Sequence, residues 1–134
     1  VGPELGKQRF LVHVAFSSAS SAPSLGAAKA LNKDDWLVTW YRENAGLFWR
    51  GLPMEYVLLH WMGDERGNQI PEGLFMTPIA IPIGTQMLHA TGLAWAEKYK
   101  KTGRIGCTFF GDGATSEGEF HEAANFAANL RFSA

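Results

Sequence analysis

Two short stretches of the chain, 36–40 and 104–110, are largely apolar and lack the alternation of a half-buried strand. This pattern indicates strands that are covered on both faces, as in a parallel sheet between helices. A third stretch, 9–16, is rich in β-branched and aromatic residues and predicts a strand or an extended packed segment. The expected fold class is therefore α/β, with a mostly parallel sheet flanked by helices.

Helical spacing and capping residues predict four helices. Pro53 suits the first position of a helix that ends near Met62, before Gly63. Ser116 and Glu119 form a capping-box pattern at the start of the last helix. The other two helices are predicted at 25–31, capped by Ser24, and from Thr85 to about Lys100, before Gly103. The apolar stripe of the last helix is expected at Phe120, Ala123, Ala124, Ala127 and Leu130.

The segments between these elements are rich in turn residues. Segments 17–24 and 32–35 are predicted as a loop and a turn, and 63–77 as a long ordered loop, a kind that is usually functional. Pro82 interrupts the apolar segment 79–84, which is therefore expected to be extended rather than a central strand. Small residues in the helix after Thr85 permit close packing: Ala90, Gly92, Ala94 and Ala96.

Composition indicates one domain, residues 1–134, because 134 residues with 46% hydrophobic content suffice for a single core. A net charge of −1 argues against nucleic-acid or polybasic membrane binding, and no apolar run reaches the roughly 18–20 residues that span a bilayer. Cys107, the sole cysteine of the sequence, predicts a buried inert thiol. With no signal-peptide pattern, the expected location is cytoplasmic, or the mitochondrial matrix in a eukaryote.

The chemistry-bearing motif is Gly111-Asp112-Gly113, between the apolar stretch and the last helix. A strand, a tight turn and a helix in this order place backbone N–H groups where open α/β folds bind phosphates. Asp112 and the glutamates that follow would repel a bare anion, whereas a divalent cation bridging Asp112 to a diphosphate would be held. The alternative is an ordinary turn in which Asp112 caps the helix.

A second candidate is Tyr41-Arg42, at the end of the predicted strand 36–40. The planar guanidinium of arginine suits phosphate oxygens, and the tyrosine hydroxyl adds a donor. The alternative is a surface ion pair of Arg42 with Glu43. The four histidines have no zinc-ligand spacing, and no hydrolytic triad is apparent.

The segment 111–128 resembles the first half of the thiamine diphosphate signature, as found in the alpha subunit of the decarboxylating component of 2-oxo acid dehydrogenase complexes of the pyruvate or branched-chain type. Other shared motifs occur in the same order: Asp35-Trp36, Tyr41-Arg42-Glu43, Arg50-Gly51-Leu52-Pro53, 67–73 and Ile83-Gly84-Thr85-Gln86. The resemblance implies a thiamine diphosphate-binding fold, cut before its last strands.

The resemblance also implies roles for individual residues. Tyr41 and Arg42 match the pair that contacts the cofactor diphosphate, and Asp112 matches the magnesium ligand. Backbone contacts to the cofactor are implied for Ile81 and Ile83, at the aminopyrimidine, and for Gly111, Gly113 and Ala114, at the metal-diphosphate; Ala80, Pro82, Thr85 and Gln86 match a monovalent-cation loop of some relatives.

The implied function is oxidative decarboxylation of a 2-oxo acid, with acyl transfer to a lipoyl group on an acyltransferase. A beta subunit, in a heterotetramer, would supply the activating glutamate, so no catalytic residue is assigned to this chain. The asparagine that completes the metal site in the family would follow Ala134, and the isolated chain is expected to be inactive. Alternatives are a transketolase-like thiamine enzyme and a non-catalytic subunit-interaction module.

Overall fold

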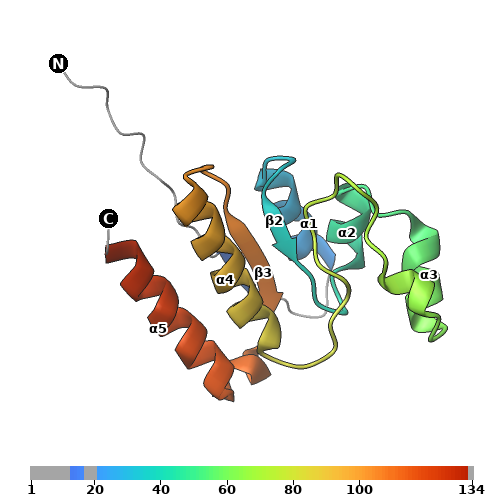
Figure 1. Cartoon of the computed structure of the whole chain (residues 1–134). Helices are drawn as coiled ribbons and strands as arrows, with labels where there is room; N and C mark the ends of the chain where they lie inside the picture. The colour runs from blue at the N-terminus through green and yellow to red at the C-terminus, as the bar shows by residue number, and fades with distance from the viewer. Residues whose placement is uncertain (1–12, 17–20, 133–134) are drawn as a thin grey trace.

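The computed structural model describes residues 13–16 and 21–132, in which a small parallel sheet separates two groups of helices (Figure 1). The predictions for 9–12 and 17–20 lie outside the described residues. The elements in chain order are β1 His13–Phe16, α1 Ser21–Ala30, β2 Trp36–Val38, α2 Asn44–Trp49, α3 Met54–Trp61, the 3-10 helix η1 Glu65–Asn68, α4 Thr85–Lys100, β3 Gly106–Phe110, the 3-10 helix η2 Asp112–Ser116 and α5 Gly118–Phe132.

The described sheet has the order β1-β3-β2, and both pairs of neighbours are parallel. In register, Cys107 of β3 lies between His13 of β1 and Leu37 of β2. Every residue of β3 is buried, which confirms the prediction of a strand covered on both faces. Helices α4 and α5 lie on one side of the sheet and α1 to α3 on the other (Figure 1).

Close packing of α4 on β3 depends on two of the small residues predicted for it, Ala90 and Ala94, whereas Gly92 is exposed. Both alanines lie on the side of α4 that faces β3, and both are buried. A Cβ atom added to Gly106 would lie 2.7 Å from the carbonyl oxygen of Ala90. Helix and strand therefore touch through their backbones at this point, and no larger residue fits without movement.

Two predictions about helix starts were wrong, and one helix was not predicted. Helix α1 begins at Ser21, so Ser24 lies inside it, buried, rather than at its cap. Helix α2 was not predicted. The capping-box start at Ser116 is also wrong, because Asp112–Ser116 forms η2 and Glu117 is extended, with ψ of 146°, before α5 begins at Gly118.

The long loop after α3 is ordered by its pairing with β2. The N–H of Leu37 donates to Phe75 at 2.9 Å, and the N–H of Thr77 donates to Leu37 at 3.1 Å. Segment 79–84 then forms no strand, as predicted. Gly84, with φ of 87°, rather than Thr85, is the cap of α4. In the described part of the chain, no helix is long and apolar enough to cross a membrane.

Candidate functional site

The candidate site lies at the carboxyl edge of the sheet, because β2 and β3 are parallel neighbours and therefore end at the same edge. The predicted site residues belong to three segments: 40–42 after β2, 81–84 before α4, and 111–114 after β3. The first and third meet directly, since a Cβ on Gly111 would lie 3.6 Å from the Trp40 ring. Parallel pairing thus assembles residues about 70 positions apart in sequence.

The residues that lead into the middle segment are held at the same edge by hydrogen bonds to Thr39. The N–H of Thr39 donates to Oγ1 of Thr77 at 3.0 Å, and its hydroxyl donates to the carbonyl oxygen of Pro78 at 2.6 Å. Further along, a Cβ on Gly84 would lie 3.3 to 3.4 Å from the Cβ atoms of Glu119 and Glu117. The segment therefore runs from the end of β2 to the start of α5.

Tyr41 and Arg42 form an aromatic–cation stack at the end of β2. The guanidinium carbon of Arg42 lies 5.2 Å from the centre of the Tyr41 ring and 5.7 Å from that of Trp40. Arg42 is exposed, whereas Glu43 is buried, so the alternative of a surface pair between them is wrong. The stack holds an exposed cation at the edge of the sheet.

The Gly111-Asp112-Gly113 turn leads into η2 rather than into a long helix. Asp112 and Gly113 are exposed and Ala114 is buried. The N–H of Ala114 donates to Gly111 at 3.1 Å, so this predicted donor is already used within the turn. Because α5 begins six residues after Asp112, the alternative in which Asp112 caps that helix is also wrong.

Ile81 and Ile83 place apolar surface beside these polar groups, since each side chain is about half exposed, at 50% and 48%. Gln86, in the first turn of α4, is buried, and its Nε2 donates to the carbonyl oxygen of Phe109 at 3.0 Å. This bond ties the start of α4 to the end of β3. The carboxyl edge therefore combines half-exposed apolar side chains, one stacked cation and the exposed carboxylates of Asp112 and Glu117.

Two polar atoms at this edge are buried without a hydrogen-bond partner among the described residues. They are Nε1 of Trp40 and Oε1 of Gln86. Buried polar atoms are nearly always paired, so each indicates a missing ligand or a missing neighbour. The sequence pointed to Gln86 only through the resemblance to a cation-binding loop, and no local signal marked Trp40, because burial of both atoms arises from contacts between distant segments.

Asp112 belongs to no ready-made cluster of three or more metal-ligating side chains in the described ranges, 13–16 and 21–132. No group of three or more His, Cys, Asp and Glu side chains there could hold a metal ion. A divalent cation at Asp112 would therefore need oxygen ligands from a bound phosphate or from residues outside this set.

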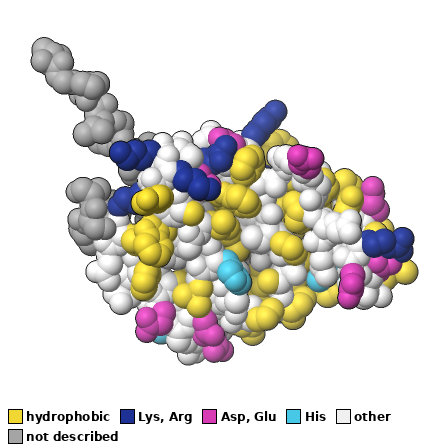
Figure 2. Space-filling view, viewed as in Figure 1, with side chains coloured by type: hydrophobic (Ala, Val, Ile, Leu, Met, Phe, Trp, Pro, Cys, Tyr) yellow, Lys and Arg dark blue, Asp and Glu magenta, His cyan; other side chains and the backbone are white. Residues whose placement is uncertain are grey.

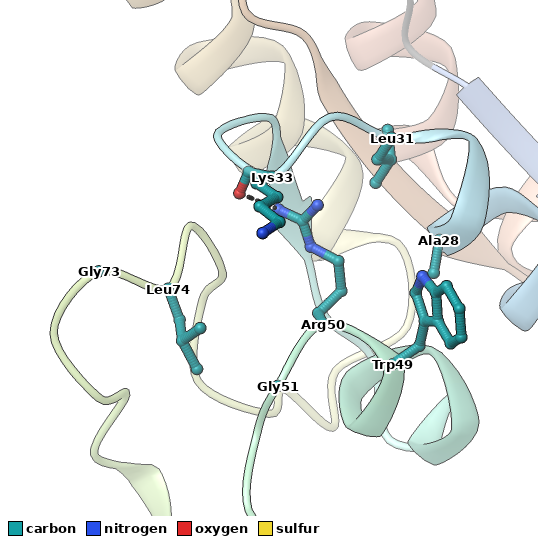
Figure 3. Close-up of a pocket in the computed structure, with 8 residues that line it drawn as sticks. All are labelled: Ala28, Leu31, Lys33, Trp49, Arg50, Gly51, Gly73 and Leu74. Carbon is teal, nitrogen blue, oxygen red and sulfur yellow. Dashed lines mark hydrogen bonds between the residues drawn. The ribbon is translucent and has the colours of Figure 1, made fainter.

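The opposite, amino edge of the sheet is closed by hydrogen bonds. Arg50 donates to the carbonyl oxygens of Asn32, Lys33 and Asp35 at 2.5, 3.0 and 2.6 Å. Figure 3 shows Arg50 in the cavity of about 420 Å³ between Leu74 and Trp49. Since its donors serve the turn before β2, this arginine is structural, and the cavity is not part of the candidate site.

The sequence matches the family model of the dehydrogenase E1 component over residues 4–134. This chain belongs to the dehydrogenase E1 component family. The match covers nearly the whole chain, including all three segments of the carboxyl-edge site. The predicted resemblance is thereby confirmed.

The relatives include both the pyruvate and the branched-chain type named in the resemblance. The chain is 40% identical over 93% of its length to the pyruvate dehydrogenase E1 component subunit alpha of Acholeplasma laidlawii, covering 36% of that protein. It is 44% identical over 80% of its length to the 3-methyl-2-oxobutanoate dehydrogenase subunit alpha of Mycobacterium tuberculosis, covering 29%. The chain spans about a third of the length of these relatives.

Proposed function

We propose that the chain is the cofactor-binding part of an E1 alpha subunit, and that the carboxyl edge of its sheet holds magnesium and thiamine diphosphate. The convergence of segments 40–42, 81–84 and 111–114 carries this proposal, supported by the unpaired Trp40 Nε1 and Gln86 Oε1. A diphosphate with a bound cation matches an edge that offers a guanidinium together with exposed carboxylates. Family membership agrees with this cofactor class.

Each segment would have its own part in binding. Arg42, held by Tyr41 and Trp40, would pair with the diphosphate, and Asp112 would hold the metal ion. Gly111 and Gly113 would allow close approach of the diphosphate to the main chain. The backbone of Ile81 and Ile83 would contact the aminopyrimidine ring, and their half-exposed side chains would add apolar surface. The Oε1 atom of Gln86 would be a ligand of a monovalent cation.

When bound, the cofactor supplies the carbanion stabilisation that decarboxylation of a 2-oxo acid requires. The substrate would be pyruvate or a branched-chain 2-oxo acid, in keeping with the names of the relatives. We propose that a beta subunit completes the site in a heterotetramer, that the acyl group passes to a lipoyl-bearing acyltransferase, and that the location is the cytoplasm or the mitochondrial matrix. Because Asp112 belongs to no cluster of three or more ligating side chains among the described residues, the isolated chain is expected to bind the cofactor weakly.

The test is reductive acylation of a lipoyl domain by this chain assembled with its beta-type partner, with pyruvate and 3-methyl-2-oxobutanoate as substrates. Arg42→Gln should raise the half-saturating thiamine diphosphate concentration about 10- to 100-fold, from the loss of roughly 1.5–3 kcal/mol of charge-assisted binding. Arg66→Gln is the matched control, because Arg66 is exposed and pairs with Asp64 in η1, outside the three site segments. Equal effects of the two substitutions would contradict the role of Arg42.

A further inference from the structure

The amino edge of the sheet contains a cavity that the proposed function does not use. It measures about 420 Å³ and lies between Leu74 of the long loop and Trp49 at the end of α2 (Figure 3). Small-molecule sites in proteins have volumes of roughly 300–1,000 Å³, so this space can take a small organic ligand. The residues that line this space, the amino-edge cavity, include two cations and no acidic side chain.

The two cations of the amino-edge cavity are Lys33 and Arg50. Besides the three N–H groups that bind the turn before β2, Arg50 has two further donors, Nε–H and the second N–H of Nη1, and neither has a protein partner in the ranges 13–16 and 21–132. Partial burial lowers the pKa of the Arg50 guanidinium, although Asp35 attracts it. An anion in the cavity would accept from these donors and stabilise the buried cation.

The carboxylates that are close to the cavity in sequence are not available as this anion. Asp34 pairs with Arg104 at 3.2 Å, and both carboxylate oxygens of Asp35 accept from backbone N–H groups, at 2.7 and 3.0 Å. Glu72 is exposed and does not line the cavity. Figure 2 shows Lys and Arg side chains gathered at the top of the view, where Figure 1 places the amino end of β3. This end of the molecule therefore attracts anions from solvent.

The remaining wall of the amino-edge cavity is apolar. Leu31 and Leu74 are half-buried and pack against the core. Trp49 is 56% exposed, with Nζ of Lys29 4.7 Å from its ring centre. Gly73, with φ of 86°, also lines the cavity, and an added Cβ there would have no atom within 4 Å, so the space beside it is open. A ligand that fills this space would contact apolar side chains as well as the two cations.

We propose that the amino-edge cavity binds a small organic carboxylate that has an apolar body. The carboxylate would accept from Arg50 and pair with Lys33, and the apolar body would pack against Trp49 and Leu74. A bare inorganic anion would leave the apolar wall in water, and a neutral apolar ligand would leave the donors without an acceptor.

This inference goes beyond the proposed function, because the cavity lies at the edge of the sheet opposite to the cofactor site. Its ligand requires neither thiamine diphosphate nor a beta-type partner. Failure of the carboxylate site would leave cofactor binding untouched, and failure of cofactor binding would leave the carboxylate site untouched.

The test is titration of the full chain, without cofactor, with phenylacetate, followed through the NMR signal of the Trp49 indole N–H. This signal should shift saturably, with a Kd of about 1 mM or below, as a ligand of this size allows. The amide signals of Gly51 and Gly73, which also line the cavity, should shift with it. Phenylacetamide, which lacks the charge, and acetate, which lacks the apolar body, should each bind at least about tenfold more weakly.

Matched substitutions test the two parts of the site, all at exposed positions where the fold should be kept. Lys33→Gln should weaken phenylacetate binding about fivefold or more, whereas Lys100→Gln, on α4 and outside the cavity, should not. Trp49→Leu, followed through the Gly73 amide, should weaken binding about threefold or more, because the aromatic contact is lost. Its control is Trp61→Leu, since Trp61 is 54% exposed on α3 and does not line the cavity.

Three results would overturn the proposal. One is the absence of a saturable shift at the Trp49 indole. Another is a ligand that needs only half of the site, either phenylacetamide that binds as tightly as phenylacetate or inorganic phosphate that shifts the same signal with an equal Kd. The third is an equal effect of Lys33→Gln and Lys100→Gln, which would show that the cation of the cavity does not pair with the carboxylate.

Discussion

At the scale of single residues, burial in the sheet changes the acidity of the Cys107 thiol. The thiol lies fully buried in the central strand, and burial raises its pKa from 9.0 to about 12. Above pH 9.0 the unfolded chain loses the thiol proton while the folded chain keeps it, so the unfolded state binds fewer protons. The free energy of unfolding should therefore fall as pH rises through this window.

Cys107→Ser should remove this dependence, because a serine hydroxyl does not ionise there. Urea unfolding at pH 8, 9 and 10 should show the wild-type chain losing up to about 1.4 kcal/mol per pH unit more than the variant, once pH exceeds 9.0. Parallel pH profiles for the two proteins would contradict burial of the thiol.

Residue types made Asp112 and Arg42 candidates with ordinary structural alternatives left open, and only the resemblance to the family assigned them to the site. The same reasoning could not find Trp40 Nε1 or Gln86 Oε1, because a polar atom becomes unpaired only when distant segments bury it. It also counted Ala114 N–H as an available donor, although the tight turn uses this group for its own hydrogen bond to Gly111.

At the scale of elements, the contact between α4 and β3 sets the position of α4 on the sheet. The first residue of α4, Thr85, directly follows site segment 81–84. Gly106→Ala should destabilise the fold by about 1–3 kcal/mol, since its Cβ would lie 2.7 Å from a backbone oxygen that cannot rotate away. Gly26→Ala, where nothing lies within 4 Å of the added Cβ in α1, should be neutral or stabilise by up to about 1 kcal/mol. Equal urea midpoints for the two variants would contradict this packing.

The types of the long elements were predictable, but several boundaries were not. Continuous hydrophobicity identified β3, and Gly63 follows the end of α3 as expected, but Pro53 is the N-cap of α3 rather than its first helical residue. The capping-box pattern at Ser116 was misleading, because local hydrogen bonds such as Thr115 Oγ1 to Asp112 at 2.6 Å stabilise a 3-10 turn instead. Helix α2 is only six residues long and is stabilised by buried Leu47 rather than by its own spacing pattern.

At the scale of the whole molecule, the two edges of the sheet differ in kind. The amino edge is closed by side chains that serve the backbone: Arg50 binds three carbonyl oxygens, and Asp35 accepts from the N–H groups of Asn32 and Ile105 at 2.7 and 3.0 Å. The carboxyl edge instead presents an exposed cation and carboxylate and has two unpaired buried atoms. This asymmetry is what a binding edge requires.

The most direct test is calorimetric titration of thiamine diphosphate, with and without Mg²⁺, into this chain assembled with its beta-type partner. Asp112→Asn should raise the Kd measured in Mg²⁺ about 100-fold, or roughly 2.7 kcal/mol, and abolish the gain in affinity that Mg²⁺ gives. Asp34→Asn is the matched control, an exposed carboxylate at the amino edge that pairs with Arg104. It should bind the cofactor as the wild type does. An Asp112→Asn variant with wild-type, magnesium-dependent affinity would contradict the assignment of the carboxyl edge as the cofactor site.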